Sequence, residues 1–266
     1  MQAFRNYILD WFNHYGRQHL PWRQNYHPYN ILVSELMLQQ TQVERVIPKY
    51  LAFMKQFPDS KTLAAAPLKD VLIAWQGLGY NRRAKFLQKT AQAVEINGGK
   101  FPTEYKDLLK LPGVGPYTAS AITAFSYNKP IRMIETNIRT VFIYHFFPDR
   151  EDVSDTELFP LIDEALDTNN PRIWYSALMD YGSTLKKLLP NPSRKSKHHT
   201  KQSTFKGSLR QTRGEILRVL SSTDELSPEE LFSKLVTNSK NHQSALEQLL
   251  KEELVFNDSG VIKLAE

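Results

Sequence analysis

Apolar residues recur at helical spacing along most of residues 1–189. The pattern is clearest in three runs, over residues 4–15, 43–54 and 138–145, where apolar side chains return every three or four positions. Pairs of turn-forming residues separate the runs, at Asp59-Ser60, Ala66-Pro67, Gly98-Gly99 and Lys129-Pro130. No strand-like alternation interrupts them. The pattern predicts an all-α fold over residues 1–189, formed by two helical lobes with a cleft between them.

A different pattern begins near Leu209. It predicts helices over residues 209–221, after the capping box of Ser227, and over residues 242–253. Two short apolar strands, 255–256 and 261–264, then flank a turn at 257–260. Three helices followed by a hairpin predict a winged-helix-like domain over residues 208–266. Its third helix is rich in Glu, which favours protein contact or nonspecific docking over reading of a major groove.

Composition narrows the class of protein. With 266 residues and 41% apolar content, the chain can bury one large core or two smaller ones. Its apolar runs are too short to span a bilayer and its N-terminus lacks a signal-peptide profile, so we expect a cytoplasmic location without membrane contact. The chain contains no cysteine, which excludes disulfides, thiolate zinc sites and cysteine-ligated iron–sulfur clusters.

Positive charge is concentrated in one segment. Residues 181–214 contain nine Lys and Arg and no Asp or Glu, so this segment has a charge of +9. Because the whole chain has a net charge of +6, the remaining residues together have a net charge of −3. The nine are Lys186, Lys187, Arg194, Lys195, Lys197, Lys201, Lys206, Arg210 and Arg213. Such a segment is typical of contact with a polyanion, or of a solvated linker, which we place at residues 190–207. The two interpretations are compatible.

Two glycine turns suit phosphate binding. The run Leu111-Pro112-Gly113-Val114-Gly115 predicts a tight turn whose glycines can adopt positive φ, with a helix opening behind it at Tyr117. The run Gly77-Leu78-Gly79-Tyr80 leads into two arginines, Arg82 and Arg83, which adds cations to exposed backbone. The alternatives are helix caps or connectors, with solvated arginines in the second case.

A carboxylate lies in an apolar helix over residues 31–38. Burial of Glu35 there would raise its pKa towards neutrality and make it a general acid. The alternative is a structural Glu that caps a helix or pairs with Arg. The amides of Gln39-Gln40-Thr41-Gln42 follow at once, and these could fill the gap left by an extruded base or be ordinary surface residues.

A second carboxylate, Glu135, precedes Thr136 and Asn137, either of which could cap a helix that starts at Ile138. An anion at a helix start is stabilised by the helix dipole and stays charged. A protonated Glu35 and an ionised Glu135 provide the two roles that glycosidic bond cleavage requires. The alternative for Glu135 is an ordinary N-terminal helix charge.

Residues 20–185 resemble the helix-hairpin-helix DNA glycosylase superfamily, and within it the adenine DNA glycosylases of the MutY type. The resemblance rests on Leu20-Pro21-Trp22-Arg23, on the very specific block Ser34-Glu35-Leu36-Met37-Leu38-Gln39-Gln40-Thr41-Gln42-Val43, on both glycine turns, and on Met179-Asp180-Tyr181-Gly182. It implies that Glu35 protonates adenine N7 and that Tyr117 lies in the base pocket. Bifunctional relatives have a lysine at that position, so the resemblance implies a glycosylase without Schiff-base lyase chemistry.

The resemblance also implies a set of DNA contacts. The turn at 111–115 grips the backbone, Gln39 and Gln40 probe the duplex, and a monovalent cation at the hairpin is compatible with the family. The catalytic candidates are Glu35, Tyr117, Glu135 and Asn137. The DNA-binding candidates are Gln39, Gln40, Gly77, Gly79, Tyr80, Arg82, Leu111, Gly113, Val114, Gly115, Lys186, Lys187, Arg194, Lys195 and Lys197. No metal ligands are expected.

Three departures from the family change the expectation. Glu135 stands where the family has a catalytic Asp, so the carboxylate reaches one methylene farther. The basic run from Lys186 stands where most relatives have four cysteines, and it looks like a substitute for the cluster-supported loop. The C-terminal domain differs from the Nudix-like domain that recognises 8-oxoguanine in these relatives.

We therefore expect a monomeric, cluster-free glycosylase, associated with the nucleoid, that acts on mismatched or damaged duplex DNA. The leading substrate is adenine opposite guanine or 8-oxoguanine. One alternative is a mismatch thymine or uracil glycosylase. Another is a DNA-binding protein of the same fold whose change at Glu135 ended catalysis.

Overall fold

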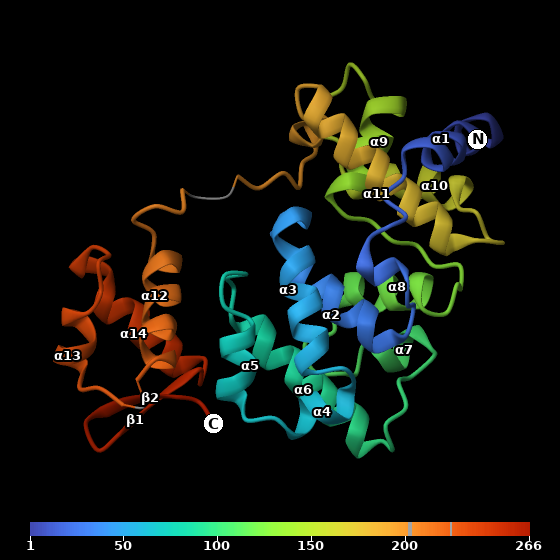
Figure 1. The fold of residues 1–266 in the computed structure, drawn as a ribbon. Helices are drawn as coiled ribbons and strands as arrows, with labels where there is room; N and C mark the ends of the chain where they lie inside the picture. The colour runs from blue at the N-terminus through green and yellow to red at the C-terminus, as the bar shows by residue number, and fades with distance from the viewer. Residues whose placement is uncertain (202–203, 224) are drawn as a thin grey trace. The chain divides into compact units, whose positions relative to one another are not determined.

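The computed structural model describes residues 1–201, 204–223 and 225–266. These residues are mostly helical, which confirms the predicted all-α class (Figure 1). The helices before residue 189 are α1 (Gln2–Tyr15), α2 (Pro28–Leu38), α3 (Val43–Gln56), α4 (Ser60–Ala65), α5 (Leu68–Ala74), α6 (Arg82–Ile96), α7 (Tyr105–Leu108), α8 (Pro116–Phe125), α9 (Thr136–Phe146), α10 (Asp155–Ala165) and α11 (Pro171–Leu188). The three helical runs predicted from periodicity are confirmed as α1, α3 and α9.

The chain forms two compact units. Unit 1 contains residues 1–32, 102–110 and 114–201, and unit 2 contains residues 33–101, 111–113 and 202–266. The domain bounds expected from the sequence stay a prediction, and residues 202–203 of the expected linker lie outside the described residues. Among the helices of the described ranges, none is long and apolar enough to cross a membrane.

In unit 1, α11 packs against both α9 and α1. The side chains at this junction are large and apolar, and Phe12, Phe142, Trp174 and Leu178 are fully or almost fully buried. Pro171 at the first helical position and the Asn170 cap define where α11 begins. In the core of unit 1, the start of α9 lies against the C-terminal half of α11, where Asn137 meets Gly182.

A buried carboxylate connects α11 to the chain that follows α1. Asp180 is 2% exposed and accepts hydrogen bonds from the Arg17 backbone N–H (2.7 Å), from the Arg17 side chain and from Arg23. Burial raises the pKa of Asp180, but the hydrogen bonds and charges of Arg23 and Arg17 outweigh this effect and lower it overall. This cluster explains structurally why Arg23 and Asp180 occur in the two motifs at residues 20–23 and 179–182.

Residues 190–197 fold against unit 1. The turn Pro192–Lys195 contacts α9, and its Pro192 and Ser193 are buried. A parallel bridge then joins Ser196 to Val153, with hydrogen bonds from the Val153 N–H to the Lys195 oxygen (2.9 Å) and from the Lys197 N–H to the Val153 oxygen (3.0 Å). This part of the basic segment has a defined position on its unit.

Unit 2 is built around α6, which packs against α4 and α5. Its C-terminal part contains α12 (Leu209–Ser221), α13 (Pro228–Ser233) and α14 (His242–Lys251), followed by strands β1 (Val255–Asp258) and β2 (Val261–Leu264). The order of three helices and a hairpin is as predicted, whereas the winged-helix assignment stays a prediction.

Two expected boundaries in the C-terminal part were wrong. The third helix ends at Lys251 rather than Glu253, because Glu253 adopts a left-handed conformation (φ 54°). The β-strands run to Asp258 and from Val261, so the turn consists of Ser259 and Gly260, both at positive φ. This conformation suits a two-residue hairpin loop.

Candidate functional site

Glu35 lies near the end of α2 in unit 2. Its exposed fraction is 5%, and the flanking residues 31–37 are all buried. The predicted burial of this carboxylate is therefore confirmed. Helix α2 ends at Leu38, so Gln39 and Gln40 form the turn after it, and Gln40 is exposed at positive φ (55°). The two amides lie at the end of the helix that contains Glu35.

Arg83 joins this helix end to the Gly77–Tyr80 turn, called the glycine turn below. The Arg83 guanidinium donates hydrogen bonds to the carbonyl oxygens of Leu36, Gln39 (2.7 Å), Leu78 (3.2 Å) and Gly79 (2.9 Å). Burial lowers the pKa of Arg83 to about 10, so the side chain remains charged at neutral pH. The expectation that Arg83 is solvated or contacts phosphate was wrong, because its donors bind main-chain carbonyls inside unit 2.

The glycine turn itself faces outward. Gly77 (φ 88°), Gly79 (φ 70°) and Tyr80 (φ 48°) all adopt left-handed conformations and are exposed. Arg82 is also exposed, and its guanidinium lies 5.0 Å from the centre of the Phe86 ring. The four predicted DNA-binding residues of this segment are thus accessible at the start of α6.

The Leu111–Gly115 turn, called the hairpin turn below, presents backbone rather than apolar side chains. Leu111 (7% exposed) and Val114 (5% exposed) are buried, while Gly113 and Gly115 are exposed. Leu111 and Val114 therefore offer little surface to a ligand, and the accessible part of the turn is the backbone of Gly113 and Gly115. Gly113 adopts positive φ (76°), but Gly115 does not (φ −86°), so the expectation for the second glycine was wrong.

Helix α6 also holds the first part of the hairpin turn. The Thr90 hydroxyl donates to the Pro112 carbonyl oxygen (2.5 Å). A Cβ added to Gly113 would lie 2.5 Å from Phe86 Cβ, which is far inside van der Waals contact. Gly113 is therefore required by its backbone conformation and by its close approach to α6.

Replacing Gly113 by Ala should lower the free energy of unfolding by about 2 to 5 kcal/mol, because positive φ and overpacking against Phe86 both oppose a methyl group. Gly79→Ala is the matched control, since it has positive φ but nothing within 4 Å of the added atom. We expect about 1 to 2 kcal/mol for the control. Urea unfolding measures both, and equal losses would contradict the close approach of Gly113 to Phe86.

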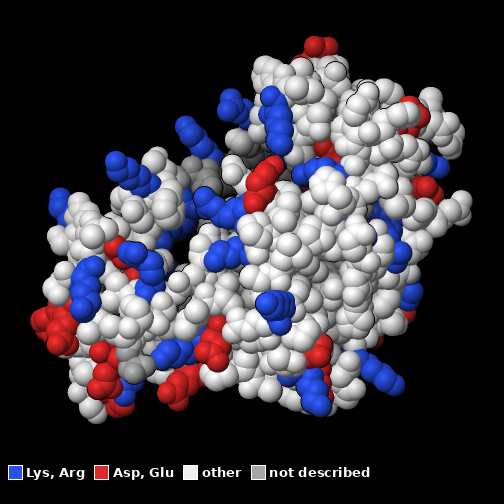
Figure 2. Space-filling model, in the orientation of Figure 1, with Lys and Arg blue, Asp and Glu red and all other residues white. Residues whose placement is uncertain are grey.

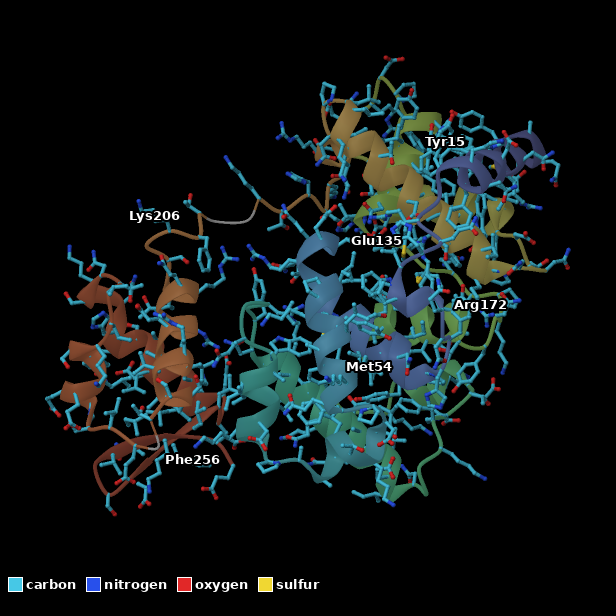
Figure 3. All side chains as sticks on the ribbon, viewed as in Figure 1. Tyr15, Met54, Glu135, Arg172, Lys206 and Phe256 are labelled. Carbon is cyan, nitrogen blue, oxygen red and sulfur yellow. The ribbon has the colours of Figure 1, made fainter. Side chains whose placement is uncertain are left out.

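Glu135 is the N-cap residue of α9 in unit 1 (Figure 3). Its Oε1 accepts hydrogen bonds from the backbone N–H groups of Asn137 (2.8 Å) and Ile138 (3.0 Å), and its Oε2 accepts one from the Asn137 amide (3.1 Å). The predicted cap at Thr136 or Asn137 was wrong, because the Glu135 side chain folds back and starts the helix at Thr136. The additional methylene of Glu is accommodated by this fold-back.

Asn137 lies where α9 meets α11. A Cβ on Gly182 of α11 would be 2.2 Å from the Asn137 carbonyl oxygen, so only glycine allows this packing. Within the described residues, the buried Asn137 Oδ1 has no hydrogen-bond partner. Asn137 thus orients Glu135 through its amide nitrogen and keeps one buried acceptor unsatisfied.

The remaining candidates of unit 1 differ in exposure. Tyr117 lies in the first turn of α8 and is half-buried. Lys186, a predicted DNA contact, is also half-buried. Burial lowers the pKa of Lys186, and the nearby charge of Glu135 partly opposes this effect. Lys187, Arg194 and Lys197 are exposed, whereas Lys195 donates to the Pro148 carbonyl oxygen (2.5 Å).

Metal binding finds no support in the described ranges, where no group of three or more His, Cys, Asp or Glu could hold a metal ion. The chain also contains no cysteine, so it offers no thiolate ligand for an iron–sulfur cluster. A monovalent cation at the hairpin turn stays a prediction.

The structure groups the predicted residues within each unit. In unit 2, α6 and its Arg83 bring together the end of the Glu35 helix, the glycine turn and the start of the hairpin turn. In unit 1, Glu135, Asn137 and Lys186 gather at the start of α9. The structural roles of Arg83 and Asp180 were not predicted from the sequence. The position of Asp180 in the motif at residues 179–182 was a usable signal, whereas no such signal marks Arg83.

Known DNA repair proteins are similar in sequence to this chain. Residues 33–159 match the model of the HhH-GPD superfamily of base excision DNA repair proteins. An adenine DNA glycosylase of Buchnera aphidicola subsp. Baizongia pistaciae is 43% identical over 145 residues, covering 54% of this chain and 41% of that protein. An adenine DNA glycosylase of Mycolicibacterium smegmatis is 37% identical over 182 residues, covering 67% of this chain and 61% of that protein.

Among solved structures, a thermostable thymine-DNA glycosylase matches with a TM-score of 0.61 and 26% identity, over 74% of this chain and 89% of that one. The chain spans about half the length of the curated relatives it matches.

Proposed function

Because the chain belongs to the HhH-GPD superfamily of base excision DNA repair proteins, we propose that it is a monofunctional DNA glycosylase. It hydrolyses the N-glycosidic bond of a base flipped out of duplex DNA. Its leading substrate is adenine opposite guanine or 8-oxoguanine, as the names of its relatives suggest. The observation that carries the proposal is the burial of Glu35 in a helix whose end is fixed to the glycine turn by Arg83.

The reaction divides between the two carboxylates. Glu35 donates a proton to adenine N7, the bond from the sugar to the base breaks, and the base leaves as a neutral species. The anionic Glu135 stabilises the positive charge that develops on the sugar. Water then adds at C1′ and releases one proton, which balances the proton that Glu35 gave to the base. Tyr117 occupies the position where a Schiff-base lysine would be needed, so no lyase step follows.

The DNA contacts come from backbone and cations. The glycine turn, Arg82 and the hairpin turn bind phosphates of the duplex, and Gln39 and Gln40 probe the position of the flipped base. Lys187, Arg194 and Lys197 add charge from the basic segment, and Lys195 helps to hold that segment in place. The basic run from Lys186 replaces the loop that a cluster supports in the family it resembles. The protein acts as a cluster-free monomer on nucleoid DNA in the cytoplasm.

A single-turnover assay tests the proposal. Duplexes with A opposite G, A opposite 8-oxoguanine, T opposite G and U opposite G are incubated with excess protein, and abasic sites are cleaved by alkali. Release of adenine from the first two duplexes alone supports the assignment. Abasic product without any strand cleavage before alkali supports the monofunctional reaction.

A second candidate is release of mismatched thymine, which the similarity to a thymine-DNA glycosylase favours. Product from the T·G and U·G duplexes but not from the adenine duplexes would establish it. Salt-sensitive binding to all four duplexes without any product would instead identify a DNA-binding protein of this fold.

Glu135→Gln should lower the rate of base release by about 10²- to 10³-fold, because the amide removes the anion that stabilises the sugar cation. Glu135→Asp is the matched variant, since it keeps both the charge and an effective N-cap. We expect its rate to stay within about tenfold of the wild-type rate. Single-turnover rates measure both, and an unchanged rate for Glu135→Gln would contradict the role of the anion.

A further inference from the structure

Lys49 of α3 lies against the glycine turn within unit 2. A Cβ added to Gly77 would be 3.4 Å from Lys49 Cε and 3.8 Å from Lys49 Nζ, so the end of the lysine side chain covers the open side of this glycine. Lys49 is half-buried, and it forms no hydrogen bond or ion pair through its side chain within residues 1–201, 204–223 and 225–266. An ammonium group therefore lies beside the turn with its N–H donors available to a ligand.

The carbonyl groups of the turn are directed into unit 2. Arg83 donates to the carbonyl oxygens of Leu78 (3.2 Å) and Gly79 (2.9 Å). Trp75 Nε1 also donates to the Gly79 carbonyl oxygen (3.2 Å). No cis peptide bond occurs in the described part of the chain, and in a trans peptide the C=O and N–H groups point in opposite directions. The Gly79 N–H, which shares its peptide with the Leu78 carbonyl, therefore points away from Arg83.

The space beside this N–H is open. Gly79 is exposed, and nothing in the described residues lies within 4 Å of a Cβ added to it. Its N–H donates to no residue in the part of the chain that the structure describes. Figure 2 shows Lys and Arg side chains over the part of unit 2 where α3 and this turn lie. An anion can therefore approach the backbone closely, as phosphates do at glycine-rich turns.

The charge on this face of α3 is also unbalanced. Arg45 is exposed, lies one helical turn before Lys49, and forms no ion pair within the described ranges. Glu44 is the only acidic residue of α3, and it lies five positions before Lys49, on a different face of the helix. Like charges at i and i+4 destabilise a helix. An anion bound beside Lys49 would relieve this repulsion.

We propose that Lys49 and the Gly79 N–H together bind one phosphate of the DNA duplex. The N–H group fixes the position of the phosphate, and the ammonium group contributes a charge-assisted hydrogen bond. Helix α3, which holds none of the DNA contacts assigned above, thus supplies a cation to the glycine turn. This inference rests on the proposed function, in which the glycine turn contacts DNA.

The test compares full-length variants on an undamaged duplex at about 50 to 200 mM salt, so that binding is measured without catalysis. Lys49→Gln should raise the Kd about tenfold at the lowest salt and reduce the slope of log K against log salt by about 0.9, the value for one phosphate contact. Lys49→Arg should keep the wild-type slope, because it retains the charge. Lys55→Gln is the matched control, since Lys55 is exposed in the last turn of the same helix. Its slope should equal that of the wild type.

A neutral methylphosphonate at a single phosphate locates the contact. The duplex contains an uncleavable abasic analogue, which fixes the register of the protein on the DNA. At one position of the methylphosphonate, the wild-type slope should fall by about 0.9. Lys49→Gln should show no further fall at that position, because the contact is already lost. A further fall at every position would overturn the inference.

The variants separate a phosphate contact from a structural role. If Lys49→Gln keeps the wild-type slope, or if Lys55→Gln lowers the slope equally, the inference is overturned, whereas base release by the wild type would still support the proposed function. The midpoint of thermal unfolding should be the same for Lys49→Gln and the wild type, and a lowered midpoint with an unchanged slope would show that Lys49 only packs on the turn. If the wild-type protein shows no salt-dependent binding of duplex DNA, the proposed function itself fails.

Discussion

Glu35→Gln should reduce the single-turnover rate of adenine release by about 10²- to 10⁴-fold, the range that general acid catalysis contributes. The substitution preserves size and hydrogen-bonding capacity but removes the transferable proton. Because Glu35 is the only acidic residue of α2, no other carboxyl group of that helix can take over its role. Binding of the undamaged duplex should change by less than about twofold, since in the proposed reaction the carboxyl donates its proton only to an extruded base.

Glu229→Gln provides the matched control for this variant. Glu229 is exposed in the first turn of α13, outside the residues assigned to catalysis or DNA contact, and the chemical change is identical. Its rate should equal that of the wild type. If Glu35→Gln releases adenine at the wild-type rate, the role of Glu35 as the acid is contradicted. If the same variant releases thymine at an unchanged rate, only the excision of purines needs the proton.

The sequence predicted the helices well because their signal is local. The spacing of apolar residues in α1, α3 and α9 predicts which face of each helix is buried, without any information from the rest of the chain. The burial of Glu35 followed from the same argument, since its helix is apolar nearly all round. Proline and serine at the start of α13 likewise fixed that boundary without any tertiary information.

The polar connections could not be predicted in the same way. Arg83 binds carbonyl oxygens of α2 and of the glycine turn, and nothing near it in the sequence distinguishes it from the exposed Arg82. Which of two adjacent arginines is buried depends on the helical phase of α6 against its neighbours. A polar side chain in a specific motif is therefore as consistent with a structural role as with a ligand contact.

The N-cap of α9 illustrates a different limit. Cap preferences favour Ser, Thr, Asp and Asn, so Thr136 and Asn137 were expected to cap rather than Glu135. In the structure, Glu135 does so by folding its longer side chain back onto two N–H groups. The carboxylate that we propose to act in the chemistry therefore also starts the helix. A carboxylate held in this way is pre-oriented, which is what stabilisation of a transient cation requires.

Asp180→Asn should lower the free energy of unfolding by about 3 kcal/mol, because it leaves two arginines next to a neutral amide in the interior of unit 1. Removing one partner of a buried ion pair usually costs about 3 to 5 kcal/mol. We expect the lower end of this range because the Arg17 side chain is 27% exposed and keeps partial hydration. Asp163→Asn is the matched control. Asp163 pairs with Arg132, and their side chains are 44% and 48% exposed, respectively. We therefore expect Asp163→Asn to lower the free energy of unfolding by less than about 1 kcal/mol. Urea unfolding at neutral pH measures both variants, and similar losses would contradict the assigned role of the buried cluster.

The same carboxylate should make the stability of the protein sensitive to acid. The pKa of Asp180 is lowered overall in the folded protein, so its stabilising contribution is complete above the ordinary Asp pKa of about 3.9 and is lost as the pH falls through the folded value. The difference in unfolding free energy between the wild type and Asp180→Asn should thus be constant from neutral pH to about pH 5 and shrink below about pH 4. A difference that persists unchanged at lower pH would mean that the loss in Asp180→Asn arises from packing.

Because the cluster joins α11, which positions the start of α9, the variant should also lose base release on heating before the wild type does.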